Sequence, residues 1–290
     1  MTPALEPLEV GIFSRTWRRP SLEDVLDAAA GHGFRAIHFN FASAGLPSLP
    51  DAIDPDVCAS IRAAFEARGM VMVGVSGTYN PIHPDEVRRA AETERARRLI
   101  LAAPSLGTRF VSLSTGTRDP NDMWRDHPRN GHPSARRDLR NTLEVLIRAA
   151  DEAGVDLGIE PEHRNVVASA TDAARLLAEM RTPRLRIILD AANLVAVAAP
   201  ERQRDVLAQA FDLLAPHTAV LHAKDTALDG SHVAAGSGFL DYPFLFEMIG
   251  RHRLDVPVII HDALENDVAR AREFVEGLAA PVRARLMAAG

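Results

Sequence analysis

Four apolar runs in the second half of the chain decide the fold: VDLGIEPEH (residues 155–163), LRIILDAAN (185–193), TAVLHAKD (218–225) and VPVIIHDAL (256–264). They end in Glu160, Asp190, His222 and His261, at successive spacings of 30, 32 and 39 residues. Such runs, rich in Val, Ile and Leu, are typical of short parallel strands that are buried on both faces. The spacing of each step fits one strand, one helix and two loops.

Working outward from these runs, the whole chain divides into eight strand–helix units. The expected strands cover residues 8–13, 35–41, 70–77, 109–116, 155–160, 185–190, 218–223 and 256–261. The expected helices cover residues 21–33, 54–68, 84–103, 134–153, 170–181, 200–214 and 241–252, and a last helix begins at about 266. This alternation predicts a parallel sheet with right-handed crossovers.

Eight such units can close into a barrel or remain an open, doubly wound sheet. No Gly-x-Gly-x-x-Gly motif follows the first strand, which disfavours a dinucleotide-binding open sheet. We therefore predict a (β/α)8 TIM barrel that forms a single domain over residues 1–290. Barrel enzymes carry their chemistry at the carboxyl ends of the strands, so we expect the four terminal side chains to lie together there.

Composition excludes several classes of protein. The net charge of −6, from 33 basic and 39 acidic residues, disfavours a nucleic-acid-binding protein. The single cysteine, Cys58, cannot form an internal disulfide, and its setting in DPDVCASIRAAF indicates a buried helix residue rather than a nucleophile. No signal peptide and no membrane span are apparent, so we expect a soluble cytoplasmic protein. A homo-oligomer is compatible with the sequence.

The four terminal side chains make a plausible ligand set for one divalent metal ion. Two carboxylates and two imidazoles suit Mn, Zn, Co, Mg or Fe, and they leave coordination positions for substrate oxygens. Glu162 lies two residues after Glu160 on an extended segment, so both side chains should point the same way. We predict that Glu160, Asp190, His222 and His261 bind the metal.

Lys224 follows His222 by two residues and is the only lysine, because Arg occupies the other 32 of 33 basic positions. A GC-rich genome explains the excess of Arg but not the place of this one lysine. Residues two apart on a strand share a face, so Lys224 should point toward the same cavity as His222. We expect it to contact a substrate oxygen or to act as a general acid; a structural ion pair with Asp225 or another carboxylate is the alternative.

Loops at the same face carry further polar side chains. An aromatic platform and a basic side chain are common in sugar sites. Trp124 could equally anchor a loop. We treat His32, His38, His163 and His217 as structural or solvent-facing. The candidate substrate contacts are Asn40, His83, Arg118, Trp124 and Glu162.

The chain resembles the xylose isomerase-like barrels of the sugar phosphate isomerase/epimerase group over about residues 8–276. The resemblance is carried by SGTYNPIHPD, STGTRDPNDMW, GIEPEHRNVV, ILDAANL, LHAKD, DGSHVAAGSGFLDYPFLF and VIIHDAL. Members similar to tagatose epimerase bind a divalent metal through Glu, Asp, His and Glu. Carried over, the first three ligands become Glu160, Asp190 and His222, whereas the fourth position is His261 instead of Glu. Asn193 stands where those epimerases often have His, and we expect it to be a further substrate contact.

The resemblance implies a metal-dependent isomerase or epimerase that acts on a small carbohydrate, or its phosphate, through an enediolate. Glu160 would be the first-choice base, with His261 or Lys224 handling the proton on the other face. In the epimerases the two Glu ligands form the proton-transfer pair, so His261 puts classical epimerisation in doubt. The same enediolate could instead expel a β-substituent, which would make the protein a dehydratase or a glycoside-cleaving lyase. A barrel that only binds sugar, without catalysis, is a further alternative.

Overall fold

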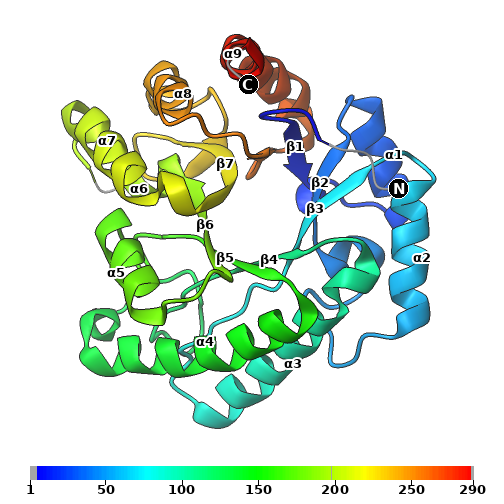
Figure 1. The fold of residues 1–290 in the computed structure, drawn as a ribbon, viewed down its shortest axis with the longest axis vertical. Helices are drawn as coiled ribbons and strands as arrows, with labels where there is room; N and C mark the ends of the chain where they lie inside the picture. The colour runs from blue at the N-terminus through cyan, green and yellow to red at the C-terminus, as the bar shows by residue number, and fades with distance from the viewer. Residues whose placement is uncertain (1–4, 197, 289–290) are drawn as a thin grey trace.

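The computed structural model describes residues 5–196 and 198–288, which form a closed barrel of parallel strands surrounded by helices (Figure 1). Consecutive strands pair in parallel, and pairings of β9 with β1, β7 with β9 and β6 with β7 close the ring. The expected (β/α)8 TIM barrel is therefore confirmed. The barrel strands are β1 (Val10–Phe13), β2 (Ala36–Phe39), β3 (Val71–Ser76), β4 (Phe110–Leu113), β5 (Asp156–Ile159), β6 (Leu185–Asp190), β7 (Thr218–Thr226) and β9 (Val258–Ile260).

The surrounding helices lie on the outside of the ring in chain order (Figure 1). Their starts carry the expected capping chemistry; for example, the Ser21 hydroxyl accepts a hydrogen bond from the Asp24 backbone N–H at 3.1 Å. Gly33, just after the first helix, has the left-handed φ of 78° that ends many helices. The helices are α1 (Leu22–Gly31), α2 (Pro55–Glu66), α3 (Glu86–Leu106), α4 (Pro133–Ala153), α5 (Ala170–Met180), α7 (Gln203–Leu214), α8 (Tyr242–Arg251) and α9 (Val268–Ala288).

Two short elements were not expected from the sequence, and both lie at the carboxyl ends of strands. Helix α6 (Ala191–Val195) begins directly after β6. Strand β7 continues to Thr226, three residues beyond the expected end, and pairs in antiparallel register with β8 (His232–Ala234). Polar and small residues such as those of 224–234 carry no apolar alternation, so the hairpin left no recognisable pattern in the sequence.

Large apolar side chains fill the interior of the barrel below the carboxyl ends of the strands. Phe110, Ile188, Val220 and Ile259, from β4, β6, β7 and β9, form a small buried cluster of their own. The much larger apolar core lies between the strands and the helices. A barrel of this size is a packed core rather than a pore, so a small molecule can reach only its carboxyl end.

Glycines on neighbouring strands make room for the largest of these side chains, Phe110. A Cβ atom added to Gly158 on β5 would lie 2.2 Å from Phe110 Cζ, and one added to Gly74 on β3 would lie 2.7 Å from Phe110 Cδ1. Both distances are far below van der Waals contact. Small residues on β3 and β5 therefore allow one aromatic ring from β4 to fill the interior.

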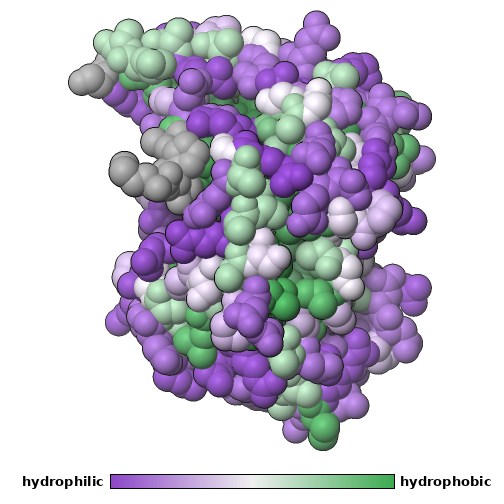
Figure 2. Space-filling model, turned by 90° about the vertical axis from the view of Figure 1, so that its right-hand side faces the viewer, coloured by the Kyte–Doolittle hydropathy of each residue, from purple (hydrophilic) through white to green (hydrophobic). Residues whose placement is uncertain are grey.

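The outer surface is predominantly polar. Figure 2 shows one side of the molecule, where hydrophilic residues dominate and apolar residues occur in smaller groups between them. Among the described residues, no helix combines the length and the apolar composition needed to cross a membrane. The first four residues of the N-terminal segment considered for a signal peptide lie outside the described residues.

We expect Gly158→Ala to destabilise the protein by about 1–3 kcal/mol, because the added methyl group overpacks the interior against Phe110. Urea denaturation of the purified variant measures this change. The control is Gly277→Ala on α9, where an added Cβ meets no atom within 4 Å and should stabilise the helix by about 0.5–1 kcal/mol. Equal stability of Gly158→Ala and wild type would contradict the packing argument.

Candidate metal and substrate site

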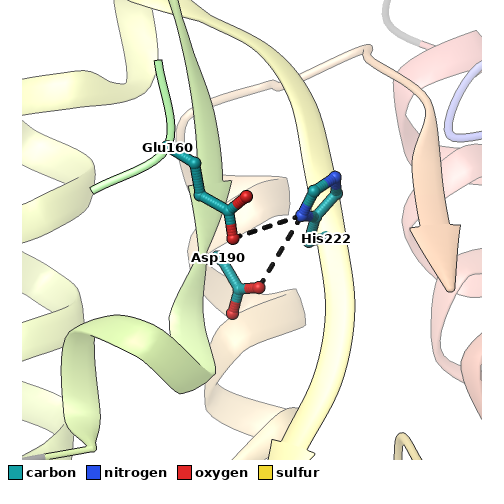
Figure 3. Close-up of side chains that lie close together, drawn as sticks. All are labelled: Glu160, Asp190 and His222. Atoms are coloured by element: carbon teal, nitrogen blue, oxygen red, sulfur yellow. Dashed lines mark ion pairs between the residues drawn. The ribbon is translucent and has the colours of Figure 1, made fainter. Parts of the chain in front are cut away.

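Three of the expected ligands converge at the carboxyl end of the barrel. Glu160 directly follows β5, Asp190 ends β6, and His222 lies opposite Asp190 on β7. Nδ1 of His222 lies 3.4 Å from Oε1 of Glu160 and 3.7 Å from Oδ2 of Asp190 (Figure 3). One ligand atom from each residue lies within 4.8 Å of the other two.

Asn193 links the two carboxylates of this group. Its side-chain amide donates to Oε1 of Glu160 at 2.7 Å, and its backbone N–H donates to Oδ1 of Asp190 at 3.2 Å. Both contacts follow from α6, which begins at the residue after Asp190 and turns Asn193 back toward β5. The side chains of Glu160 and Asp190 are thereby held in fixed orientations, with Oδ2 of Asp190 directed at His222.

Lys224 completes the charged cluster as expected from its position two residues after His222. Its ammonium Nζ lies 3.2 Å from Oδ2 of Asp190, 3.9 Å from Oε1 of Glu160 and 3.7 Å from Oδ2 of Asp262. The residue is buried. The alternative of an ion pair with Asp225 or another carboxylate is met by these other carboxylates, whereas that of Asp225 accepts hydrogen bonds from the backbone N–H groups of residues 226, 238 and 240.

Burial and mutual attraction act in opposite directions on these groups. Burial disfavours the charged form of Lys224, but the carboxylates of Asp190, Glu160 and Asp262 outweigh it and raise the pKa of the ammonium. Burial also favours the neutral form of Glu160, yet His222 and Lys224 lower the pKa of that carboxyl. Asp190 is the most deeply buried carboxylate, and burial raises its pKa.

Buried polar atoms of the group fit a divalent metal ion. Apart from the ion pairs given above, Oδ2 of Asp190 and both ring nitrogens of His222 have no hydrogen-bond partner among the described residues. Atoms bound to one ion at about 2.0–2.2 Å lie roughly 3–3.6 Å from each other. The separations from His222 Nδ1, 3.4 Å and 3.7 Å, are close to that range. Two carboxylates and one imidazole would hold such an ion.

His261 is not part of this ligand group in the described residues. Its ring stacks on that of His222, with centroids 4.9 Å and planes 20° apart, and on the other side lies 4.7 Å from the ring of Phe13. The lone pairs of an imidazole lie in the ring plane, so two stacked rings do not direct their nitrogens at one ion. The structure therefore brings together three of the four expected ligands, and His261 lies beside them.

Asp262, the residue after His261, was missed by the sequence reasoning. Its backbone has a left-handed φ of 53°, which is uncommon for a residue other than glycine. Oδ2 lies 3.2 Å from Nδ1 of His232, on the unexpected strand β8, and Oδ1 lies 3.2 Å from Nδ1 of His261. Burial favours the neutral acid, but hydrogen bonds from His232 and His261 lower the pKa of Asp262. The sequence feature that could have identified Asp262 is its place in VPVIIHDAL, directly after the last apolar run and His261.

His38 was expected to be structural or solvent-facing, and the structure places it inside the barrel on β2. Its Nε2 lies 3.0 Å from Oγ of Ser112, and its ring centroid lies 5.9 Å from that of His222. Its Nδ1 has no hydrogen-bond partner among the described residues. Burial and the neighbouring His222 lower the pKa of His38 well below its usual range, so a neutral imidazole borders the site.

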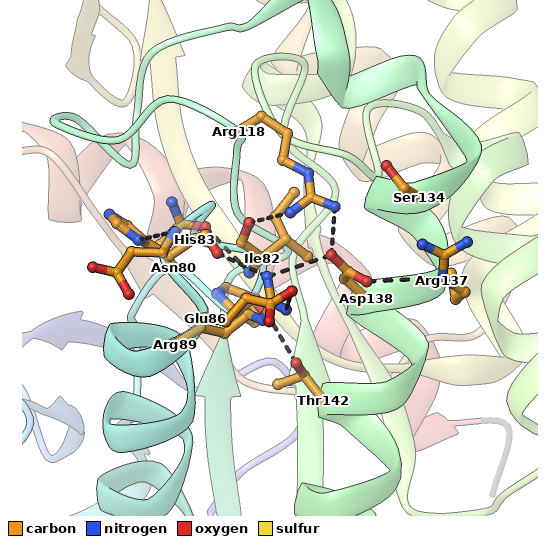
Figure 4. A network of polar contacts seen from close by, with 12 residues as sticks. Asn80, Ile82, His83, Glu86, Arg89, Arg118, Ser134, Arg137, Asp138 and Thr142 are labelled. Atoms are coloured by element: carbon orange, nitrogen blue, oxygen red, sulfur yellow. Dashed lines mark hydrogen bonds and ion pairs between the residues drawn. The ribbon is translucent and has the colours of Figure 1, made fainter.

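Arg118 and His83, two of the expected substrate contacts, direct their polar groups at neighbouring loops and helices (Figure 4). The Arg118 guanidinium is buried; it donates to the carbonyl of Ile82 at 2.9 Å and to Oδ2 of Asp138 at 2.6 Å. Nε2 of His83 lies 3.0 Å from the carbonyl of Pro120. The loops that carry them contain few regular hydrogen bonds, and these side chains supply partners for the buried backbone.

The remaining expected substrate contacts differ in exposure. Asn40 is buried, and its side-chain oxygen accepts from the backbone N–H of Ala42 at 2.9 Å. Glu162 is buried, with Oε1 3.1 Å from Nδ1 of His163. Trp124 is 49% exposed on the loop after β4.

Several of the relatives are sugar epimerases. Fructoselysine 3-epimerase of Shigella flexneri is 24% identical over 248 residues, which cover 80% of this chain and 81% of that protein. The structure of 3-keto-D-glucoside 4-epimerase from E. coli matches with a TM-score of 0.75 and 17% identity, covering 93% of this chain and 99% of that one. L-ribulose 3-epimerase matches with a TM-score of 0.74 and 16% identity over 97% of both chains.

The family assignment rests on the sequence itself. The sequence profile of one family, described as xylose isomerase-like TIM barrel, matches residues 26–279, which is most of the chain. The expected resemblance is thereby confirmed, and it agrees with the closed parallel barrel of the structure. The chain belongs to the xylose isomerase-like TIM barrel family.

Proposed function

We propose that the protein is a sugar isomerase or epimerase that depends on one divalent metal ion. The observation that carries the proposal is the group of Glu160, Asp190 and His222, whose potential ligand atoms lie within 4.8 Å of one another. This group lies at the carboxyl ends of consecutive barrel strands, where barrel enzymes perform their chemistry. A small carbohydrate, free or phosphorylated, is the proposed substrate.

The relatives support both parts of this proposal. Several of them are named as sugar epimerases. Two further barrels of the same fold have been solved with metals: one binds a zinc atom, with a TM-score of 0.70, and one from Mycobacterium smegmatis is in complex with magnesium, with a TM-score of 0.67. Zinc and magnesium prefer different ligands: imidazole suits zinc, and carboxylates suit magnesium. Because the present site offers both ligand types, it is compatible with several metals, manganese, cobalt and iron included.

In the proposed reaction Glu160 removes the proton next to the sugar carbonyl. Asn193 holds Oε1 of Glu160 at 2.7 Å, so Oε2 is the oxygen that would accept the proton. A bound divalent ion would polarise the adjacent hydroxyl and carbonyl oxygens and lower the cost of forming an enediolate. Lys224 or His261 would return a proton, the former as a compact ammonium beside the carboxylates and the latter as the ring that walls the site.

Around this centre, we propose that other polar side chains bind the sugar hydroxyl groups. Glu162 and Trp124 are the candidates nearest the mouth among those expected from the sequence, with Asn40 and Asn193 deeper in the barrel end. Arg118 and His83 would act through the loops that they hold, since their polar atoms already have protein partners.

A lyase on a keto sugar is the second candidate. The observation that favours it is His261, which stands where a carboxylate would complete the proton-transfer pair of an epimerase, and its ring is stacked rather than directed at the ligand group. A barrel of the same fold from Bacillus anthracis, with a TM-score of 0.68, is described as a probable 3-DHS dehydratase. Loss of a β-substituent from the enediolate would need only one base on the carbon acid.

The first prediction concerns the metal. We expect the purified protein to bind one divalent ion, and His222→Ala and Asp190→Asn each to weaken binding at least tenfold, because the ion loses one of three protein ligands. Chelator competition and elemental analysis measure this. His217→Ala, an exposed histidine five residues from His222, is the control and should bind as wild type. Unchanged metal content in both site variants would refute the ligand assignment.

The second prediction concerns the carbon acid. Incubation of keto and aldo sugars with enzyme and metal in D₂O should place deuterium next to the carbonyl of the true substrate, and Glu160→Gln should slow exchange by about 10²–10⁴-fold. Glu201→Gln, at an exposed carboxylate, is the control.

Free fructose and tagatose should epimerise weakly or not at all, because His261 replaces a carboxylate. An epimer as product indicates the first candidate and an eliminated group the second, whereas no exchange with any sugar would favour a barrel that only binds.

The third prediction separates a chemical from a structural role of Lys224. Lys224→Arg should lose most turnover, because a guanidinium is a far weaker acid than an ammonium, and a fall in melting temperature would assign part of that loss to packing among the carboxylates. Steady-state kinetics and thermal melts of the same preparation measure both quantities. Full turnover in the Arg variant would leave Lys224 with a purely electrostatic role.

A further inference from the structure

The Lys224 ammonium contacts the same two carboxylate oxygens that belong to the proposed ligand group. Nζ is 3.2 Å from Oδ2 of Asp190 and 3.9 Å from Oε1 of Glu160. These are the two oxygens that lie 3.7 Å and 3.4 Å from Nδ1 of His222. An ammonium at this place repels a second cation, because two positive charges about 4 Å apart in a partly polar interior repel strongly.

A third carboxylate, Asp262, lies within reach of the same ammonium at 3.7 Å. Asp262 follows β9, and its carboxylate oxygens lie 3.2 Å from Nδ1 of His232 on β8 and 3.2 Å from Nδ1 of His261. The three carboxylates of Glu160, Asp190 and Asp262 carry three negative charges. One ammonium and one divalent ion together neutralise them, with two carboxylates for the ion and one for the ammonium.

We propose that Lys224 is an internal competitor of the divalent cation, and that Asp262 retains the ammonium when a cation binds to Asp190 and Glu160. The inference rests on the proposed metal site and adds a specific role for two residues beside it. In this arrangement Lys224 compensates the buried carboxylates, and Asp262 limits how strongly it opposes metal binding.

The test measures Mn²⁺ binding by calorimetry for wild type, Lys224→Met, Asp262→Asn and the double variant. We expect Lys224→Met to bind Mn²⁺ at least tenfold more tightly, because the competing charge is gone. Asp262→Asn should bind Mn²⁺ about tenfold more weakly than wild type. The double variant should bind Mn²⁺ less than threefold more weakly than Lys224→Met. Asp229→Asn removes an exposed carboxylate on the nearby hairpin turn and serves as the control for general loss of negative charge.

Thermal melts give a readout that does not depend on activity. Chelator-treated Lys224→Met should melt at a lower temperature than wild type, since two buried carboxylates lose their counter-ion, and Mn²⁺ should raise its melting temperature by more than that of wild type. If Lys224→Met does not yield folded protein, Lys224→Gln removes the same charge with a polar side chain. A crystal structure with bound Mn²⁺ should place Nζ nearer to Asp262 than to Asp190.

The outcomes distinguish this inference from the proposed function. Equal Mn²⁺ affinity of wild type and Lys224→Met, or an equal loss from Asp262→Asn in both backgrounds, overturns the competition while leaving the metal site intact. Failure of every variant and of wild type to bind Mn²⁺ or Zn²⁺ overturns the metal site, and the competition with it.

Discussion

The pairing of β6 with β7 is the constraint on which the site depends, because it places positive groups beside buried carboxylates. Asp190 is fully buried, and a carboxylate removed from water is costly unless an opposite charge or hydrogen bonds compensate it. The pairing shifts register between Ile187 and Ile188, after which Asp190 lies opposite His222. A slip by one residue would turn His222 and Lys224 to the other face of the strand and leave Asp190 uncompensated.

The rest of the barrel confines chemistry to one end. Phe110 and its apolar neighbours fill the interior, and Gly158 and Gly74 provide the space that the ring needs. The extension of β7 adds a second constraint at the open end. The Asp225 carboxylate accepts hydrogen bonds from the backbone N–H groups of residues 226, 238 and 240, which hold the segment after the hairpin beside Lys224. This segment and the packed interior of the barrel together keep Lys224 buried.

The fold and the convergence of three candidate ligands could be predicted from the sequence because both depend on strand periodicity. A buried parallel strand has a recognisable composition, and its last residue lies at a known end of the barrel. Periodicity carries no information about the backbone beyond that last residue. The left-handed turn at Asp262 and the stacking of His261 depend on tertiary contacts with Phe13 and His222. Likewise, the sequence predicts a substrate contact at Arg118, whereas the structure uses its guanidinium to satisfy Ile82 and Asp138.

The single lysine of the chain is best understood through the geometry of its neighbours. Elsewhere Arg forms ion pairs with one or two carboxylates, as for Arg68 with Asp27 and for Arg184 with Asp151 and Asp156. Lys224 instead lies among three carboxylates that approach from different strands, at 3.2–3.9 Å. A compact ammonium with three rotatable donors suits such a position better than a rigid guanidinium, because no orientation of a plane serves all three. The shape of the charged cluster therefore favours Lys over Arg at this position, in a chain that uses Arg at every other basic position.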